Sequence, residues 1–300
     1  VKNKKCSLKI INANECSYPN AWHNYQACAS YDHKNWFRVE TQYDGKILTI
    51  SHTPEFNSVY YAFFAPYSYE QHLALIGTAQ QLPYCTASDL GDSVDERPIT
   101  LLTIGDEKTA KLKYWLIARQ HAGESMAEWF IEGLLQRLAN YDDPVIKSLL
   151  SQVVFYIVPN MNPDGSVRGH LRANAKGFDL NRCWQKPSAE ESPEVFYVRQ
   201  KMLETGVDFC LDVHGDEELP YVFLNSAADN NSFSTKQKEL TERFVETFLR
   251  LSPDFQTEYG YAPRQFGEGT LTLATNYVAD QFGCLAFTLE MPFKDNANLP

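Results

Sequence analysis

The sequence of 300 residues has no long apolar run and no cluster of basic residues. No stretch approaches the roughly 18 apolar residues of a membrane-spanning helix, and the opening VKNKKCSLKI lacks the apolar centre of a signal peptide. Its 27 Lys and Arg residues are scattered among 38 Asp and Glu residues, giving a net charge of -11. We therefore expect neither a membrane nor a nucleic acid among its partners.

The cysteines also lack a pattern. Their number, seven, is odd, and no pair has CxxC spacing, which argues against a disulfide framework and against a thiolate zinc site. Free thiols are most simply explained by a reducing compartment, so we expect a cytoplasmic protein. Nothing in the sequence indicates an oligomeric state.

The two halves of the chain differ in the pattern of their apolar residues. Residues 36–76 are rich in aromatic and β-branched residues that often alternate, with a turn signal at Asp44-Gly45, and this pattern predicts antiparallel strands. After about residue 100, short apolar runs alternate with helical patterns, as in an α/β domain. We predict a sandwich-like all-β domain over residues 1–98 and an α/β domain over residues 99–300.

The second domain should contain a mixed, mainly parallel sheet flanked by helices. The runs KYWLIA, VVFYIVP, DFCLDV and CLAFTLE have the length and composition of buried strands. The segment ESMAEWFIEGLLQRLAN has an apolar helical face that should pack on this sheet. The aromatic run VYYAFFAPY is better explained as a half-buried strand than as a ligand platform.

His121 and Glu124 directly follow the first of these runs, where an open α/β sheet binds ligands. An imidazole and a carboxylate three residues apart can converge on one zinc ion. HxxE is common by chance, so the pair alone is a weak signal. A catalytic zinc needs a third protein ligand, and His214 follows another apolar run; a lone histidine there would more often be structural, but its match with the pair favours a metal site.

Rarer motifs lie between and after these residues: NPDG at 162–165, DLNR at 179–182 and FTLEMPF at 287–293. Together with HxxE and the later histidine, they resemble in order and approximate spacing the zinc carboxypeptidases of the M14 type. The chain looks most like their cytosolic carboxypeptidase branch, and YYAFFAPYSYEQH resembles the strand and turn that close the N-terminal domain of that branch. The resemblance spans roughly residues 55–293.

The resemblance implies one Zn²⁺ per chain, held by His121, Glu124 and His214, which lowers the pKa of a water molecule and polarises the cleaved carbonyl. It also implies that Glu290, at the end of an apolar run, is the general base and acid that moves the proton from this water to the leaving amine. A solvent-facing glutamate at a strand end is the alternative for Glu290.

Arginine and amide side chains complete the implied site. Asn181 and Arg182 would bind the terminal carboxylate of a peptide, and Arg172 would stabilise the oxyanion. Asp179 is a candidate for accepting the second ring N–H of a zinc-bound histidine. We interpret Arg168 as a solvated surface charge, and Asp216 with the acidic residues after it as a solvated loop.

The chain departs from the family pattern in three places. No tyrosine lies in register about twenty residues before Glu290, and Tyr259, Tyr261 and Tyr277 remain candidates without an assigned role. The segment GTLTLATNYVADQFG contains no Lys or Arg, so a neutral or apolar C-terminal residue is at least as plausible a substrate as glutamate. Ten residues follow Glu290, fewer than the family's last helix needs, so the resemblance implies a domain that continues beyond residue 300.

These observations predict a zinc-dependent metallocarboxypeptidase that acts on the C-terminus of a peptide or protein. One alternative is a zinc amidohydrolase for N-acyl amino acids or cell-wall peptides, which should lack the NPDG and DLNR set. Another is an inactive peptide-binding module, which has little need of Glu290.

Overall fold

The N-terminal part of the chain forms two small antiparallel sheets. The computed structural model describes residues 2–262 and 265–297, so the outermost residues of both predicted domains, 1 and 298–300, lie outside the described residues. The first sheet has the order β1-β5-β4 and the second β3-β2-β6. The strands are β1 (Cys6–Ile10), β2 (Cys28–Ser30), β3 (Trp36–Arg38), β4 (Glu40–Tyr43), β5 (Leu48–His52) and β6 (Tyr60–Ala62).

A hairpin joins β4 to β5 at the predicted turn. Gly45 has a φ of 94°, which glycine adopts without steric cost, and the Asp44 carboxylate accepts the backbone N–H groups of Lys46 and Ile47. Leu48 and Ile50 of β5 then point into a small apolar core, which confirms the β-rich character of this domain.

The second part of the chain is built on a sheet of seven strands in the order β12-β13-β11-β9-β10-β8-β7. Strands β13, β11, β9 and β10 run parallel to one another, whereas β12 pairs antiparallel with β13, β8 with β10, and β7 with β8. The predicted mixed, mainly parallel sheet is therefore confirmed. The strands are β7 (Cys85–Asp92), β8 (Pro98–Ile104), β9 (Leu112–Ala118), β10 (Val153–Val158), β11 (Phe209–Asp216), β12 (Phe223–Ser226) and β13 (Leu285–Pro292).

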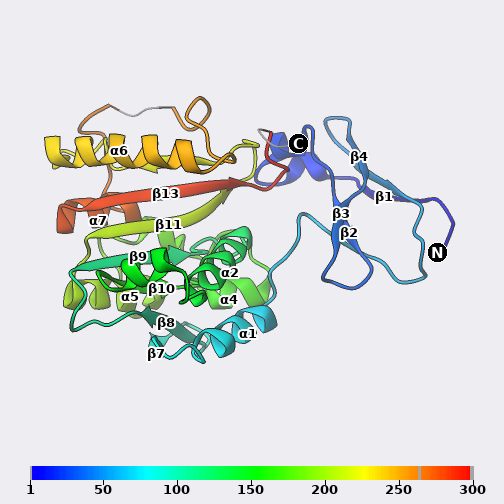
Figure 1. The fold of residues 1–300 in the computed structure, drawn as a ribbon. Helices are drawn as coiled ribbons and strands as arrows, with labels where there is room; N and C mark the ends of the chain where they lie inside the picture. The colour runs from blue at the N-terminus through cyan, green and yellow to red at the C-terminus, as the bar shows by residue number, and fades with distance from the viewer. Residues whose placement is uncertain (1, 263–264, 298–300) are drawn as a thin grey trace.

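Helices cover both faces of this sheet (Figure 1). They are α1 (Tyr69–Ala79), α2 (Met126–Ala139), α3 (Pro144–Leu150), α4 (Pro163–Arg168), α5 (Pro193–Thr205), α6 (Thr235–Leu251) and α7 (Ala274–Phe282), with short 3₁₀ turns η1 (Ala13–Glu15), η2 (Pro19–Trp22) and η3 (Leu180–Arg182). None of the helices in the described part of the chain combines the length and apolar character that a membrane span requires.

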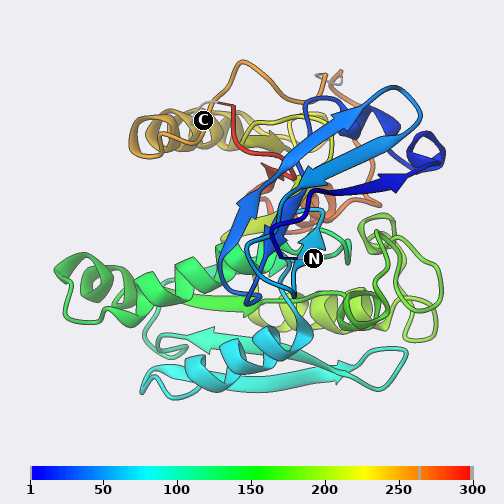
Figure 2. The ribbon, with the colours of Figure 1, turned by 90° about the vertical axis from the view of Figure 1, so that its right-hand side faces the viewer.

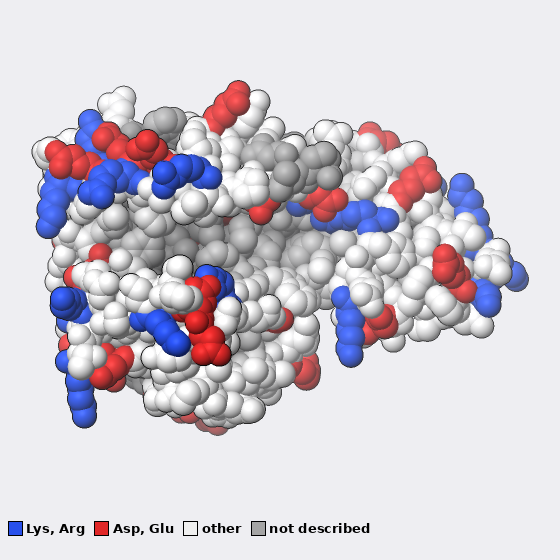
Figure 3. Space-filling model, viewed as in Figure 1, with Lys and Arg blue, Asp and Glu red and all other residues white. Residues whose placement is uncertain are grey.

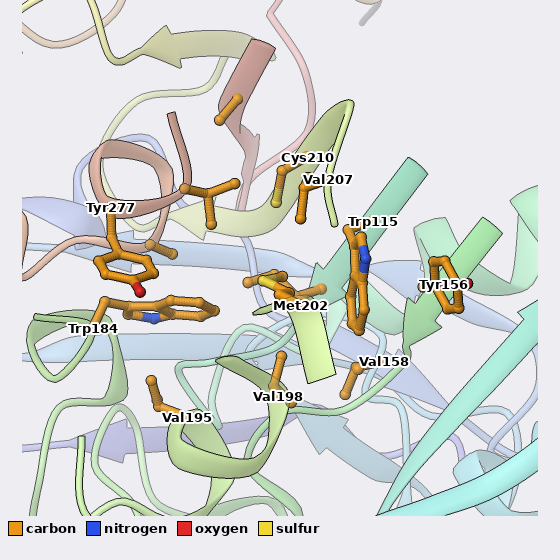
Figure 4. Packing of buried hydrophobic residues seen from close by; sticks show 14 of the residues in the cluster. Trp115, Tyr156, Val158, Trp184, Val195, Val198, Met202, Val207, Cys210 and Tyr277 are labelled. Atoms are coloured by element: carbon orange, nitrogen blue, oxygen red, sulfur yellow. The ribbon is translucent and has the colours of Figure 1, made fainter. Parts of the chain in front are cut away.

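Each face of the sheet has its own apolar core. On one face, α5 and α7 pack over Trp115 and Tyr156, whose rings stack 4.9 Å apart (Figure 4). On the other face, α1, α2 and α3 pack over strand residues such as Ile157, and Ile131 and Leu135 of α2 are buried there. Burial on both faces explains why the central strands appear as continuous apolar runs in the sequence.

The seven-stranded sheet begins before the predicted domain boundary at residue 98. Strand β7 pairs with β8 through residues such as Ser88 and Leu101, and α1 packs beside α2. Both elements precede the predicted boundary but pack with the α/β part. We therefore propose to draw the boundary between β6 and α1.

The N-terminal sheets lie beyond the carboxyl ends of β11 and β13 (Figures 1 and 2). The rings of Phe63 and Phe64 contact Phe293 with centroids 5.2 and 4.9 Å apart. Arg38 donates to the Asp295 carboxylate at 2.9 Å, which adds a polar contact at the rim. On the face shown in Figure 3, basic and acidic side chains are interspersed.

Candidate metal centre and active site

Two parallel strands bring the predicted metal ligands together. Strands β9 and β11 are neighbours in the sheet, so their carboxyl ends meet at one edge. His121 and Glu124 lie in the turn between β9 and α2, and His214 lies near the end of β11. All three side chains are buried.

The three side chains point at one another. The Nδ1 atoms of His121 and His214 lie 2.6 and 2.7 Å from the two carboxylate oxygens of Glu124. The two Nδ1 atoms are themselves 3.1 Å apart. One ligand atom from each residue thus lies within 4.8 Å of the others.

This donor set fits zinc. Two histidines and one carboxylate are a frequent ligand set of catalytic zinc, which leaves a further position open. Two nitrogens that each lie about 2.0 Å from a tetrahedral ion are about 3.3 Å apart, close to the separation found here. The residues that would hold the ion are therefore His121, Glu124 and His214, through Nδ1 of both imidazoles.

The opposite ring nitrogen of each histidine faces a carboxylate. The Nε2 atom of His121 lies 3.1 Å from Asp179 Oδ1, which is the contact predicted for Asp179. The Nε2 atom of His214 lies 2.9 Å from Asp212 Oδ2. Such carboxylates fix the tautomer that leaves Nδ1 free for a metal and raise the basicity of the ring.

Asp212 was missed from the sequence, although a signal for it exists. Side chains two residues apart on a strand point to the same face, so the Asp-Val-His run places Asp212 beside His214. Its carboxylate also accepts the Gln120 amide at 2.7 Å, and Gln120 in turn accepts the indole N–H of Trp184 at 2.8 Å. The aspartate is thereby fixed in a fully buried polar chain.

The turn that carries His121 and Glu124 depends on Gly123. The backbone N–H of Gly123 donates to Leu171 O at 2.8 Å. A Cβ atom at Gly123 would lie 2.7 Å from that same oxygen, so only glycine permits the approach. The contact couples the metal-ligand turn to the segment that carries Arg172.

The NPDG motif connects the turn that carries His121 with the segment that carries Arg172. The Asn162 side chain donates to Gln120 O at 3.1 Å and to Arg172 O at 3.3 Å, and it accepts the Gly165 N–H at 3.0 Å. Asn162 is fully buried. The motif therefore positions the site and does not line it.

The remaining predicted residues surround a cavity of about 340 Å³ beside the metal ligands. Glu290 is the register partner of His214 in the pairing of β11 with β13. Its Oε2 atom is buried and has no hydrogen-bond partner among the described residues. Burial raises the pKa of Glu290 to about 8, and the charges of Glu124 and Asp216 add to the rise.

The basic and amide side chains occupy the wall of the cavity. Arg172 donates through Nε to Asp179 Oδ2 at 2.8 Å and keeps about a third of its side chain exposed. Asn181 is fixed by η3, where its Oδ1 accepts the Ala274 N–H at 2.9 Å. Arg182 follows it and is exposed. Asp179 lies behind His121 and does not line the cavity.

Comparison with known proteins agrees with this geometry. The family described as zinc carboxypeptidase matches residues 74–299, and the cytosolic carboxypeptidase N-terminal domain matches residues 1–64. The chain belongs to the zinc carboxypeptidase family. It is a metallocarboxypeptidase, and zinc is the cofactor of the family whose donor set it keeps.

Several relatives match the whole chain. An uncharacterised protein of Zymomonas mobilis is 45% identical over 299 residues, which are 100% of this chain and 78% of that protein. The metallo-carboxypeptidase of Burkholderia cenocepacia is 54% identical with a TM-score of 0.97, covering 100% of this chain and 80% of that one. The metallo-carboxypeptidase of Pseudomonas aeruginosa, solved with (2-guanidinoethylmercapto)succinic acid, is 44% identical with a TM-score of 0.96 and the same coverage.

One of the three candidate tyrosines lies in the active site of this zinc carboxypeptidase. The hydroxyl of Tyr261 is 2.9 Å from Asp216 Oδ2 and 3.1 Å from Glu290 Oε1, within reach of both as a donor. Tyr277 packs near Trp184 in the core (Figure 4). Tyr259 stacks on the ring of Tyr221 and is not among the residues that line the cavity.

The expectation of a solvated acidic loop after His214 is wrong for Asp216 and Glu217, whereas Glu218 is exposed as expected. Asp216 and Glu217 are each only 9% exposed, and both line the cavity. Asp216 also accepts the backbone N–H groups of Glu218 and Leu219, which fixes the loop. The sequence could not show this, because Tyr18, which lines the same cavity, lies some two hundred residues away in the chain.

Proposed function

We propose that this metallocarboxypeptidase hydrolyses the C-terminal peptide bond of peptides or proteins, with Glu290 as general base and acid. The observation that carries the proposal is the buried, unpartnered Oε2 atom of Glu290 beside a His-Glu-His donor set. A buried acceptor without a partner is costly, and it is expected where a water molecule or a substrate supplies the donor.

The terminal carboxylate of the peptide binds Asn181 and Arg182. A guanidinium group presents a planar fork of donors that matches a carboxylate, and Arg182 is exposed at the cavity. The Pseudomonas relative was solved with (2-guanidinoethylmercapto)succinic acid, which carries carboxyl groups, and this supports recognition of a carboxylate by the present chain. Recognition of a free carboxylate restricts cleavage to the last residue.

The proton transfers belong to Glu290. Zinc, when bound at the three ligands, lowers the pKa of a water molecule and polarises the carbonyl group to be cleaved. Glu290 accepts the proton of the attacking water and delivers it to the nitrogen of the leaving amino acid. The Tyr261 hydroxyl lies within hydrogen-bond distance of Glu290 Oε1 and orients it.

Arg172 stabilises the oxygen that becomes negative during attack. Its guanidinium is held by Asp179 and needs little rearrangement to face that charge. Because Asp179 also contacts His121, one carboxylate fixes both a metal ligand and the oxyanion donor. Both groups are therefore positioned before the substrate arrives.

A neutral side chain suits the pocket for the last residue of the substrate. The lining of the cavity includes the uncharged side chains of Asn225, Thr275 and Thr288. The hydroxyl groups of Thr275 and Thr288 lie 2.7 Å apart and bond to each other. This lining supports a small or polar neutral C-terminal residue over glutamate.

The test is release of amino acids from a peptide library whose members end in each of the twenty residues, once as free acids and once as C-terminal amides. Zinc-dependent release from the free acids alone, with neutral residues released fastest, is the expected result. Equal cleavage of the amides would contradict the carboxylate site, and a clear glutamate preference would contradict the neutral pocket. Hydrolysis confined to N-acyl amino acids would favour an amidohydrolase.

We also propose a cytoplasmic location. All seven cysteines are free, and three of them are buried, which suits a reducing compartment. Alkylation of intact cells with a membrane-impermeant reagent should leave the exposed Cys16 unmodified. Labelling of Cys16 in intact cells would contradict this location.

A further inference from the structure

One side chain from the N-terminal domain reaches the active-site cavity. Tyr18, which precedes η2, lines the same cavity as the metal ligands. Its hydroxyl accepts a hydrogen bond from Arg172 Nη1 at 3.4 Å. The tyrosine is therefore in contact with the group that stabilises the oxyanion.

Glu217 lies beside Tyr18 in the wall of the cavity. Burial raises the pKa of the Tyr18 phenol, and the nearby Glu217 carboxylate adds to the rise. Burial likewise raises the pKa of Glu217 to about 7, with Glu124 adding to the effect. Both side chains line the cavity that the metal ligands also line.

Lys294 donates hydrogen bonds to both the segment after Tyr18 and the segment after Glu217. The Lys294 ammonium donates to His23 O at 2.8 Å and to Glu218 O at 3.2 Å. His23 ends the η2 turn that follows Tyr18, and Glu218 follows Glu217. Tyr18 and Glu217 therefore lie close to hydrogen bonds that join the two domains.

The direction of a bound peptide leads from the carboxylate site to this pair. The proposed function places the last carboxylate at Asn181 and Arg182, and the cleaved carbonyl at the metal ligands and Arg172. Asn181 accepts the Ala274 N–H, and the next residue, Thr275, lines the cavity. The residues before the cleaved bond extend away from the carboxylate site, and we place them at Tyr18, which contacts Arg172.

We propose that Tyr18 and Glu217 form a subsite for the penultimate residue of the peptide, so that the N-terminal domain contacts the substrate and basic penultimate side chains are preferred to acidic ones. The inference rests on the proposed function and names the substrate class of the same site. The Tyr18 hydroxyl donates to a backbone carbonyl of the substrate. Glu217 accepts from a cationic side chain and repels a carboxylate.

The test compares two N-acetylated tripeptides that differ only in a penultimate lysine or glutamate and end in the residue that the library assay identifies. The native enzyme should cleave the lysine peptide with a kcat/KM about tenfold higher or more. Glu217→Gln should bring this ratio close to one. Glu218→Gln, which removes an equal charge from the next, exposed residue, should leave the ratio as it is.

Tyr18→Phe gives an independent readout. Loss of one hydrogen bond to the bound peptide should raise KM about fivefold, with a much smaller change in kcat. Tyr31→Phe removes a hydroxyl that accepts the Glu55 N–H elsewhere in the same domain, and it should leave KM unchanged.

The outcomes separate the subsite from the proposed function. An active native enzyme with no lysine preference, or with a ratio that Glu217→Gln does not change, overturns the subsite and leaves the carboxypeptidase mechanism intact. A fall in kcat alone in Tyr18→Phe reduces Tyr18 to a support of Arg172 and overturns substrate contact. A native enzyme that releases no residue from either peptide overturns the proposed function and the subsite together.

Discussion

The buried carboxylate of Asp212 is predicted to control how tightly the metal is held. Asp212 is fully buried, and its Oδ2 atom lies 2.9 Å from His214 Nε2 and 2.7 Å from Gln120 Nε2. In Asp212→Asn the amide oxygen can accept both hydrogen bonds, so the shape of the site is kept. Only the negative charge behind His214 is lost.

Loss of such an outer carboxylate typically weakens metal binding about 10–100-fold, which corresponds to about 1.4–2.7 kcal/mol. We expect this increase in the zinc Kd of Asp212→Asn, measured by competition with a chromophoric chelator at fixed pH. Asp280→Asn, which removes the same charge from an exposed position on α7, serves as the control. Zinc affinities of the native protein and Asp212→Asn that agree within about twofold would refute the reasoning.

Three further predictions follow from other contacts. In Gly123→Ala the new Cβ atom meets Leu171 O at 2.7 Å, so the free energy of unfolding should fall by about 1–3 kcal/mol in urea titrations; an unchanged midpoint would contradict the close approach. Burial raises the pKa of Glu194 from 4.5 to about 7, so the protonated Glu194 side chain stabilises the fold fully below pH 4.5, and this stabilisation is lost as the pH rises through 7. The free energy of unfolding of Glu194→Gln should therefore rise by about 3 kcal/mol relative to that of the native protein between pH 4.5 and 8. A difference in unfolding free energy that does not change with pH would contradict the raised pKa. Arg172→Gln should lower kcat about 100-fold with a smaller change in KM, and an effect on KM alone would place Arg172 in binding only.

The proximity of His121, Glu124, His214 and Glu290 could be predicted because their signals are local. Each lies at or just after the end of an apolar run, and parallel strands that are adjacent in the sheet bring these ends together. The sequence could not give the strand order, but His121 and His214 converge in any order that makes β9 and β11 neighbours. The family motifs supplied the arginine and amide residues, whose spacing alone indicates no site.

The features that were missed depend on contacts between distant segments. Tyr18 reaches the cavity from the N-terminal domain, which contacts the α/β part through the rings of Phe63 and Phe293 and through Lys294. The boundary that we propose lies before the one predicted from the sequence, because β7 is an edge strand with a largely exposed, polar sequence that lacks the apolar run of a central strand.

The role proposed for Glu290 is to move the proton in a zinc-dependent cleavage of the last peptide bond. Release of C-terminal residues by the native protein and by Glu290→Gln should be compared at equal zinc content, one ion per chain. We expect the substitution to abolish release while zinc remains bound. Release by Glu290→Gln at a rate near that of the native protein, with zinc retained, would show that Glu290 does not move the proton.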